Sequence, residues 1–163
     1  WMGHMKTVLL SVVAFIAALA GFVLGSIIAS SLVTTAGTSS AEGYSYLQGN
    51  FAMLILALVG VYIVSSFGEE VVYRAFLIYR LAELGSPGKA TTAFATVGSA
   101  LVFGMAHFSW GWVGIIQTTF MGLALAGCYL LFKRRLWPLV LGHAYIDTLL
   151  LVQMYQSVPA ANL

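Results

Sequence analysis

Ionisable side chains interrupt stretches of the sequence that are otherwise apolar enough to cross a bilayer. They are Glu69, Glu70, Arg74, His107, His143 and Asp147. A charge at the centre of a membrane helix costs at least about 2.5 kcal/mol on insertion scales, so such residues indicate a functional site by default. Carboxylates beside imidazoles are groups that activate a water molecule, with or without a zinc ion. The residue types therefore predict hydrolytic chemistry inside a membrane.

The two adjacent glutamates have different expected partners. Glu70 and Arg74 are four residues apart and share one helical face, which favours an ion pair. Glu69 lies about 100° further around the helix, so it stays free for proton transfer or metal binding. The alternative is that all three residues form a buried ionic lock with a purely structural role.

Each histidine has a neighbour one helical turn away. Asp147 follows His143 by four residues and could orient or charge-stabilise its imidazole. Phe103 precedes His107 by four residues and can only pack against it. A single membrane histidine is commonly an interhelical hydrogen bonder. Two histidines together with Glu69 favour a site that activates water.

The elements that position these residues are expected to be transmembrane helices. Of the 163 residues, 61% are hydrophobic and 7% are charged, which excludes a soluble domain, a disordered tail and a nucleic-acid binder. A spanning helix needs about 20 apolar residues. Five segments meet this need: residues 7–32, 51–84, 90–108, 113–132 and 136–155. The sequence predicts an all-α, polytopic membrane helix bundle of about five transmembrane helices.

The lone Cys128 leaves no internal disulfide.

Positive charges give the expected orientation. Lys6, Arg80, Lys89 and the basic run 133–135 all fall on one side of the five predicted spans, and the opposite connections carry no Lys or Arg. Because cytoplasmic loops collect these residues, the N-terminus is expected in the cytoplasm and the C-terminus outside.

Small residues recur every four positions in two of the predicted helices. The first stripe contains Ala17, Gly21, Gly25 and Ala29, and the second contains Gly114, Thr118, Gly122 and Ala126. Such stripes let helix backbones approach closely in a membrane. Packing within one chain and formation of a homodimer both remain open.

Three motifs occur in a fixed order on separate predicted helices. Residues 69–74 match E-E-x-x-x-R, residues 103–107 match F-x-x-x-H, and residues 143–147 match H-x-x-x-[ND]. In this order they resemble the CPBP (Abi) family of intramembrane proteases, which includes the type II CAAX prenyl endopeptidases. The resemblance covers about residues 51–155, the predicted protease core. The other predicted parts are a tag remnant (1–5), a first transmembrane helix with an outer loop (6–50) and a short tail (156–163).

The resemblance also implies roles for individual residues. Catalytic roles fall on Glu69, His107, His143 and Asp147, and supporting roles on Glu70, Arg74 and Phe103. Glu69 would be the base that activates water, and His107 would hold or share that water's proton. The other two catalytic residues would stabilise the oxyanion or complete the polar site. A metal-free mechanism is favoured because no H-E-x-x-H motif is present. The alternative is zinc held by Glu69, His107 and His143.

Two positions depart from the family pattern. Ala75 stands where glycine is usual, and Asp147 stands where asparagine is common. An acid cannot donate a hydrogen bond unless it is protonated, so the change at 147 bears on the oxyanion role.

The expected function is hydrolysis of a peptide bond at or within a prokaryotic cell membrane. The partners would be membrane lipid and a peptide or protein substrate, either a prenylated protein or a peptide precursor, and no nucleic acid. The alternatives are a catalytically silent scaffold or immunity subunit, and a proton or ion pathway. On straight, upright helices the two histidines would lie about 15 Å apart in depth. Tilted or bent helices around a water-filled cavity near the midplane are therefore expected.

Overall fold

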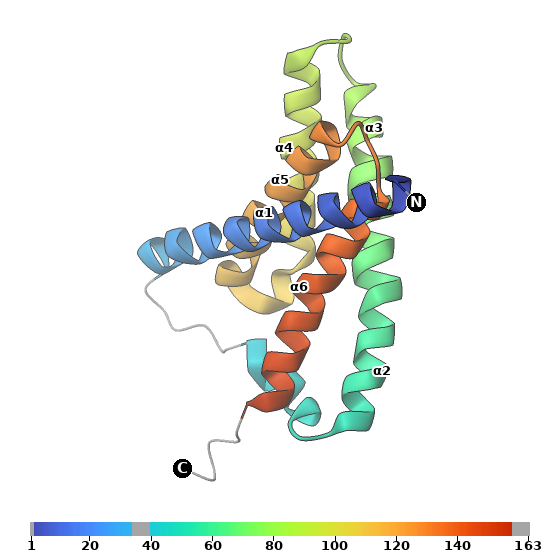
Figure 1. Cartoon of the computed structure of the whole chain (residues 1–163). Coiled ribbons are helices and arrows are strands. Elements are labelled where there is room, and N and C mark those ends of the chain that lie inside the picture. The colour runs from blue at the N-terminus through green and yellow to red at the C-terminus, as the bar shows by residue number, and fades with distance from the viewer. Residues whose placement is uncertain (1, 34–39, 158–163) are drawn as a thin grey trace.

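The computed structural model describes residues 2–33 and 40–157, and within these residues the fold is helical with no strand. In chain order the elements are α1 (Met2–Leu32), η1 (Ser40–Leu47), α2 (Phe51–Val61), η2 (Tyr62–Leu77), α3 (Ile78–Ala82), α4 (Lys89–Ala106), η3 (Phe108–Trp110), α5 (Gly111–Leu131) and α6 (Trp137–Gln156). Because α2, η2 and α3 form one continuous helix, five long helices result (Figure 1). The predicted all-α class is confirmed, and the helix ends lie close to the expected positions. Most residues interpreted as a tag remnant belong to α1, whereas most of the predicted tail lies outside the described residues.

Three helical stretches are long and apolar enough to cross a membrane. They are Gly3–Leu32, Phe51–Ala82 and Phe108–Leu131. The chain is thus an integral membrane protein. Helices α4 and α6 were also expected to span the membrane but are not among the three, and α6 carries both His143 and Asp147. The five-span arrangement and its orientation stay predictions.

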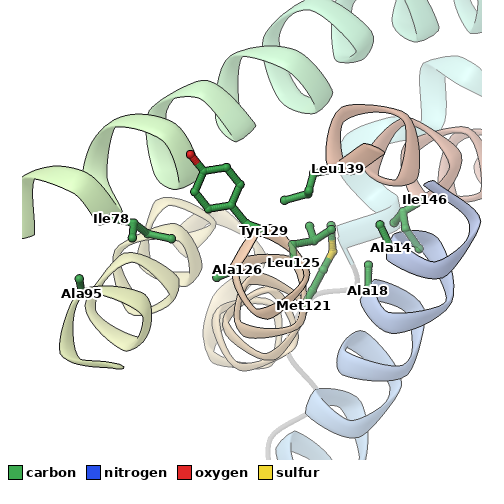
Figure 2. Packing of buried hydrophobic residues seen from close by; sticks show 10 residues of the cluster. All are labelled: Ala14, Ala18, Ile78, Ala95, Met121, Leu125, Ala126, Tyr129, Leu139 and Ile146. Atoms are coloured by element: carbon green, nitrogen blue, oxygen red, sulfur yellow. The ribbon is translucent and has the colours of Figure 1, made fainter. Parts of the chain in front are cut away.

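The main core forms where α1 packs against α5 and α6, with contributions from α3 and α4 (Figure 2). Glycines allow the close approach. A Cβ on Gly25 would lie 2.7 Å from the Cα of Gln117, and one on Gly142 would lie 2.8 Å from the Cβ of Ala14. Both distances are too short for a real side chain. The small-residue stripe of α1 is therefore used for packing within the chain.

A smaller cluster attaches η1 to the rest of the molecule. Leu47 is fully buried and packs with Leu54 of α2 and Leu151 of α6. The backbone N–H of Gly49 donates a hydrogen bond of 3.0 Å to the carbonyl of Tyr155. The segment after the first helix is thus anchored on the α2–α6 pair.

The helix that carries the glutamates is wound differently from a standard α-helix. Tyr62–Leu77 forms a π-helix, in which each backbone N–H bonds to the fifth residue before it. The residue spacing had been interpreted as an α-helix here, and that interpretation was wrong. π-Helical turns are rare and occur frequently at functional sites.

Candidate active site

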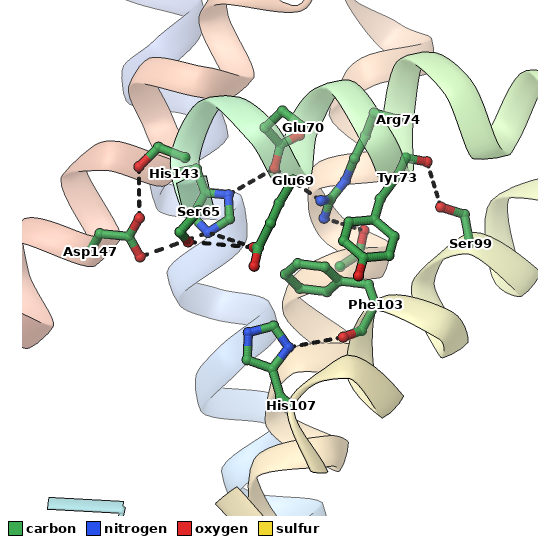
Figure 3. Close-up of polar contacts among 12 residues, drawn as sticks. Ser65, Glu69, Glu70, Tyr73, Arg74, Ser99, Phe103, His107, His143 and Asp147 are labelled. Atoms are coloured by element: carbon green, nitrogen blue, oxygen red, sulfur yellow. Dashed lines mark hydrogen bonds and ion pairs between the residues drawn. The ribbon is translucent and has the colours of Figure 1, made fainter. Parts of the chain in front are cut away.

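Three helices bring the motif residues to one place (Figure 3). Segment η2 supplies Ser65, Ser66, Glu69, Glu70 and Arg74, helix α4 supplies Phe103 and its C-terminal cap His107, and helix α6 supplies His143 and Asp147. A cavity of about 300 Å³ lies between them, lined in part by Glu69, both histidines and Asp147. A cavity is therefore present among the motif residues, with four of the six ionisable side chains in its wall. Its water content and its depth in the membrane stay predictions.

Behind the cavity wall, Glu70 connects an arginine to a histidine. Its Oε1 lies 3.0 Å from Nη1 of Arg74 and 2.8 Å from Nδ1 of His143. All three residues are at most 2% exposed. Because a carboxylate accepts hydrogen bonds, Nδ1 of His143 is the donor in this pair. Glu70 thus fixes the imidazole of His143 and directs its Nε2 away from the carboxylate.

Two further contacts hold the arginine. Its Nη2 donates to the carbonyl of Gly122 at 3.4 Å, and its guanidinium lies 4.5 Å from the centre of the Phe103 ring. A cation over an aromatic face is stabilised by the ring quadrupole. Arg74 therefore offsets the buried charge of Glu70 while packing on the phenylalanine of the second motif. The predicted ion pair forms, and it is part of a larger buried network.

Asp147 lies within ion-pair distance of His143, as the spacing of four predicted, but the two form no direct hydrogen bond. Nε2 of His143 is 3.8 Å from Oδ1 of Asp147, which is longer than a hydrogen bond. Asp147 instead accepts a short bond of 2.6 Å from the hydroxyl of Ser66. The spacing of four residues places Asp147 near the ring, but the carboxylate that orients this ring is Glu70 on another helix.

Glu69 keeps its carboxylate available to the cavity. Its side chain is 23% exposed, and its Oε2 lies 3.9 Å from Nε2 of His143. The hydroxyl of Ser65 donates to it at 3.4 Å. Among the described residues it forms no ion pair with a lysine or arginine. As the spacing predicted, the carboxylate of Glu70 is paired with Arg74, whereas the carboxylate of Glu69 faces the cavity.

His107 faces the cavity from the opposite side. Its Nδ1 bonds to the carbonyl of Phe103 at 2.9 Å, and because a carbonyl only accepts, Nδ1 carries the proton. Its ring lies 4.9 Å from that of Phe103 and 5.1 Å from that of Trp110. In the neutral imidazole, Nε2 is then an acceptor. The ring of Phe103 also lies 6.2 Å from that of His143, so the two histidines are closer than the 15 Å of straight, upright helices, as expected for tilted or bent helices.

The donor set does not fit a zinc ion in the geometry described. Zinc takes four tetrahedral ligands at about 2.0 to 2.3 Å. Within residues 2–33 and 40–157, no three His, Cys, Asp or Glu side chains converge in this way. Nδ1 of His143 is engaged by Glu70, so only its Nε2 faces the cavity.

Comparison with known protein families identifies the chain. The model of the family described as type II CAAX prenyl endopeptidase Rce1-like matches residues 50–149. The chain belongs to the Rce1-like family. The match begins just before α2, ends within α6 and includes all three motifs. This confirms the resemblance to intramembrane proteases of the CAAX type. No curated protein and no solved structure matches the chain.

The site contains further polar residues for which no role was predicted from the sequence. Ser65 and Ser66 precede Glu69 and Glu70 by one turn, so the spacing of four could have indicated the first contact. The bond from Ser66 to Asp147 joins residues 81 positions apart and has no local signal. Tyr44 and Trp110 also line the cavity.

Proposed function

We propose that this Rce1-like protein is an intramembrane endopeptidase that hydrolyses a peptide bond at or within the membrane by means of an activated water. The observation that carries the proposal is the cavity wall itself. An open carboxylate, Glu69, and an imidazole with an acceptor nitrogen, His107, line the same cavity as the oriented ring of His143. No serine or cysteine nucleophile is needed, because water is the attacking group.

The reaction begins with a water between Glu69 and His107. The carboxylate removes a proton as the water oxygen attacks the substrate carbonyl, and Nε2 of His107 accepts the second hydrogen of the water as a hydrogen bond. The protonated carboxyl then returns its proton to the leaving amine. The carboxylate is thereby restored in each cycle.

His143 is suited to stabilise the oxyanion. Because its Nδ1–H is held by Glu70, a protonated ring presents an Nε2–H to the cavity, and the buried carboxylate supports the charge of that imidazolium. Nε2 lies 3.8 to 3.9 Å from Asp147 and Glu69, close enough for a reacting oxygen to contact the ring and a carboxylate together. Asp147 completes the polar wall on this side.

A conservative substitution tests the role of the open carboxylate. Glu69→Gln keeps the shape and removes the charge, so we expect turnover to fall by about 10²- to 10⁴-fold while the protein still inserts and purifies normally. His107→Ala should act similarly. The matched control is Glu83→Gln, which changes an exposed carboxylate outside the cavity. Near-normal turnover of Glu69→Gln would remove Glu69 from the mechanism.

The substrate can be identified by comparing cells that contain the active protein with cells that contain an inactive variant. Mass spectrometry of membrane peptides from cells with the wild-type protein and with Glu69→Gln should reveal fragments present only in the first sample. We propose a peptide precursor or a prenylated protein as the source, and the sequence of the fragments distinguishes the two. Ion flux through liposomes without any peptide would instead support a conducting pathway.

We also propose that catalysis is metal-independent. The support is geometric, since Glu69, His107 and His143 do not converge as zinc ligands in the described structure. Elemental analysis of protein purified without chelator, combined with activity after exhaustive chelation, tests this. Stoichiometric zinc, with activity lost on chelation and restored by added zinc, would refute the metal-free mechanism.

A further inference from the structure

Segment η2 and helix α4 run in opposite directions and contact each other, because a short connection after α3 returns the chain along the same helix (Figure 1). The backbone of Tyr73 contacts Ser99, and its ring contacts Phe103, one turn further along α4. One turn beyond these contacts on each helix, Glu69 and His107 line the same cavity. The register between the two helices therefore decides whether the proposed base and this histidine share one cavity.

The contact between Ser99 and Tyr73 is a short hydrogen bond inside the protein. The hydroxyl of Ser99 donates to the carbonyl of Tyr73 at 2.5 Å, and Ser99 is 1% exposed (Figure 3). Within residues 2–33 and 40–157, no other hydrogen bond joins η2 to α4. Hydroxyl side chains that bond across a helix pair stabilise the pair in a membrane. The bond from Ser99 is therefore the polar link between the helices that carry Glu69 and His107.

The aromatic contacts between these two helices are less directional. The ring of Phe103 lies 5.1 Å from that of Tyr73 and 4.5 Å from the guanidinium carbon of Arg74. Aromatic pairs are favourable over centroid distances of about 4.5 to 7 Å. A hydrogen bond, in contrast, weakens steeply outside a narrow range of distance and angle. The bond from Ser99 thus restricts sliding and rotation of η2 along α4 more tightly than the ring contacts do.

The winding of η2 gives this restraint a further consequence. Tyr62–Leu77 is a π-helix, a rare winding. A change to α-helical winding would alter the rotation from one residue to the next, so it would turn Glu69 about the helix axis relative to Tyr73. A bond from α4 to the carbonyl of Tyr73 therefore also restrains the direction in which the Glu69 carboxylate points.

We propose that Ser99 is a positioning residue that fixes the register of η2 against α4 and so keeps Glu69 and His107 at one cavity. Ser99 does not line the cavity itself, and it acts through the backbone of Tyr73. Its effect on catalysis rests on the proposed function. Its effect on the register can be measured without any substrate.

Cross-linking of paired cysteines reports the register directly. Cys128→Ala removes the native buried thiol, and the chain then carries His107→Cys with either Glu69→Cys or Ser65→Cys. Ser65 lies one turn before Glu69 and lines the same cavity, so a shift of η2 along α4 changes the two cross-linking yields differently. The full chain in detergent is treated with a short bifunctional methanethiosulfonate reagent. Addition of Ser99→Ala should change the ratio of the two yields about threefold to tenfold.

Thr96→Ala is the matched control. Thr96 lies on the same helix, but its hydroxyl bonds within α4, to the carbonyl of Thr92 at 2.7 Å. Its removal leaves the contact between η2 and α4 intact, so the ratio of yields should equal that of the paired-cysteine parent. An unchanged ratio in Ser99→Ala, in a protein that melts like the parent, would refute the register role.

Kinetics in the otherwise native chain test the consequence for catalysis. Ser99→Ala should lower kcat about tenfold and leave KM unchanged, because the residue moves the proposed base without contacting the substrate. Thr96→Ala should change neither constant. A changed cross-linking ratio with a normal kcat would refute the positioning role. Failure of the proposed function would appear differently, as the expected change of ratio in a protein whose parent form cleaves no peptide.

Discussion

Two ion pairs on one continuous helix have almost the same length and opposite surroundings. Arg74 lies 3.0 Å from Glu70, with side chains 1% and 0% exposed, and Arg80 lies 2.9 Å from Glu83, with side chains 57% and 45% exposed. At the exposed pair, the hydrogen bond from Arg80 holds the pKa of the Glu83 carboxyl below its usual value. At the buried pair, water cannot replace a lost partner. Distance alone therefore does not show what an ion pair does.

The largest expected effect comes from breaking the buried pair. Arg74→Ala leaves the carboxylate of Glu70 without its cation in a fully buried site, so the free energy of unfolding should fall by about 3 to 5 kcal/mol. Turnover should fall as well, because the same carboxylate orients His143. Thermal unfolding in detergent and a cleavage assay measure the two effects. Normal melting with normal turnover would contradict the assignment.

A double variant sharpens the same comparison. Replacing both charges, as in Glu70→Gln with Arg74→Met, removes the partner and the unpaired charge together, so stability should recover relative to Arg74→Ala. We expect a coupling free energy of about 0.5 to 3 kcal/mol in a double-mutant cycle. Activity should stay low, since a neutral amide supports a charged His143 less well. Strictly additive losses would show that the two residues act independently.

A smaller effect is expected at Asp147. Its carboxylate accepts a hydrogen bond from a hydroxyl, whereas those of Glu70 and Glu83 pair with an arginine. Ser66→Ala removes the 2.6 Å bond to Asp147, which is 13% exposed, and bonds to charged groups contribute about 1.5 to 3 kcal/mol. Because Asp147 is partly exposed, we expect the free energy of unfolding to fall by an amount near the lower end of this range. Ser65→Ala is the control, because its bond to Glu69 is longer, at 3.4 Å. Equal melting temperatures for the two variants would contradict this ranking.

The smallest effect is expected at the exposed pair. Arg80→Ala should leave the melting temperature unchanged within error, because water and salt replace the lost partner. Cleavage should also be unchanged, since the residue lies outside the cavity. A destabilisation similar to that of Arg74→Ala would show that burial is not what separates the two pairs.

Local spacing predicted the parts of the site that depend on a single helix. Five helices and their approximate ends follow from apolar length and polar breaks, and the Glu70–Arg74 pair follows from a separation of four residues. The spacing of four residues also predicted that Asp147 lies beside His143, and the two side chains are 3.8 Å apart. The hydrogen bond that orients the imidazole comes from Glu70, which is 73 positions away. Only tertiary packing determines that choice.

Helix geometry was the other source of error. Residue spacing does not distinguish π-helical from α-helical winding, since both place residues four or five apart near one another. The mismatch in depth between straight helices did predict tilt or bending, and the aromatic ring of Phe103, which lies near both histidines, agrees with this. Residue spacing could not give the angles of these helices.

The Glu70–Arg74 pair has a consequence for how the chain enters the bilayer during synthesis. Both partners belong to one stretch of helix, so their charges compensate each other as soon as that stretch becomes helical. The histidine that completes the network is synthesised 73 residues later. The second hydrophobic helix can therefore leave the translocon before α6 is synthesised. Glu69 has no cation on its own helix, so its carboxylate enters the bilayer before the histidines of its site are in place.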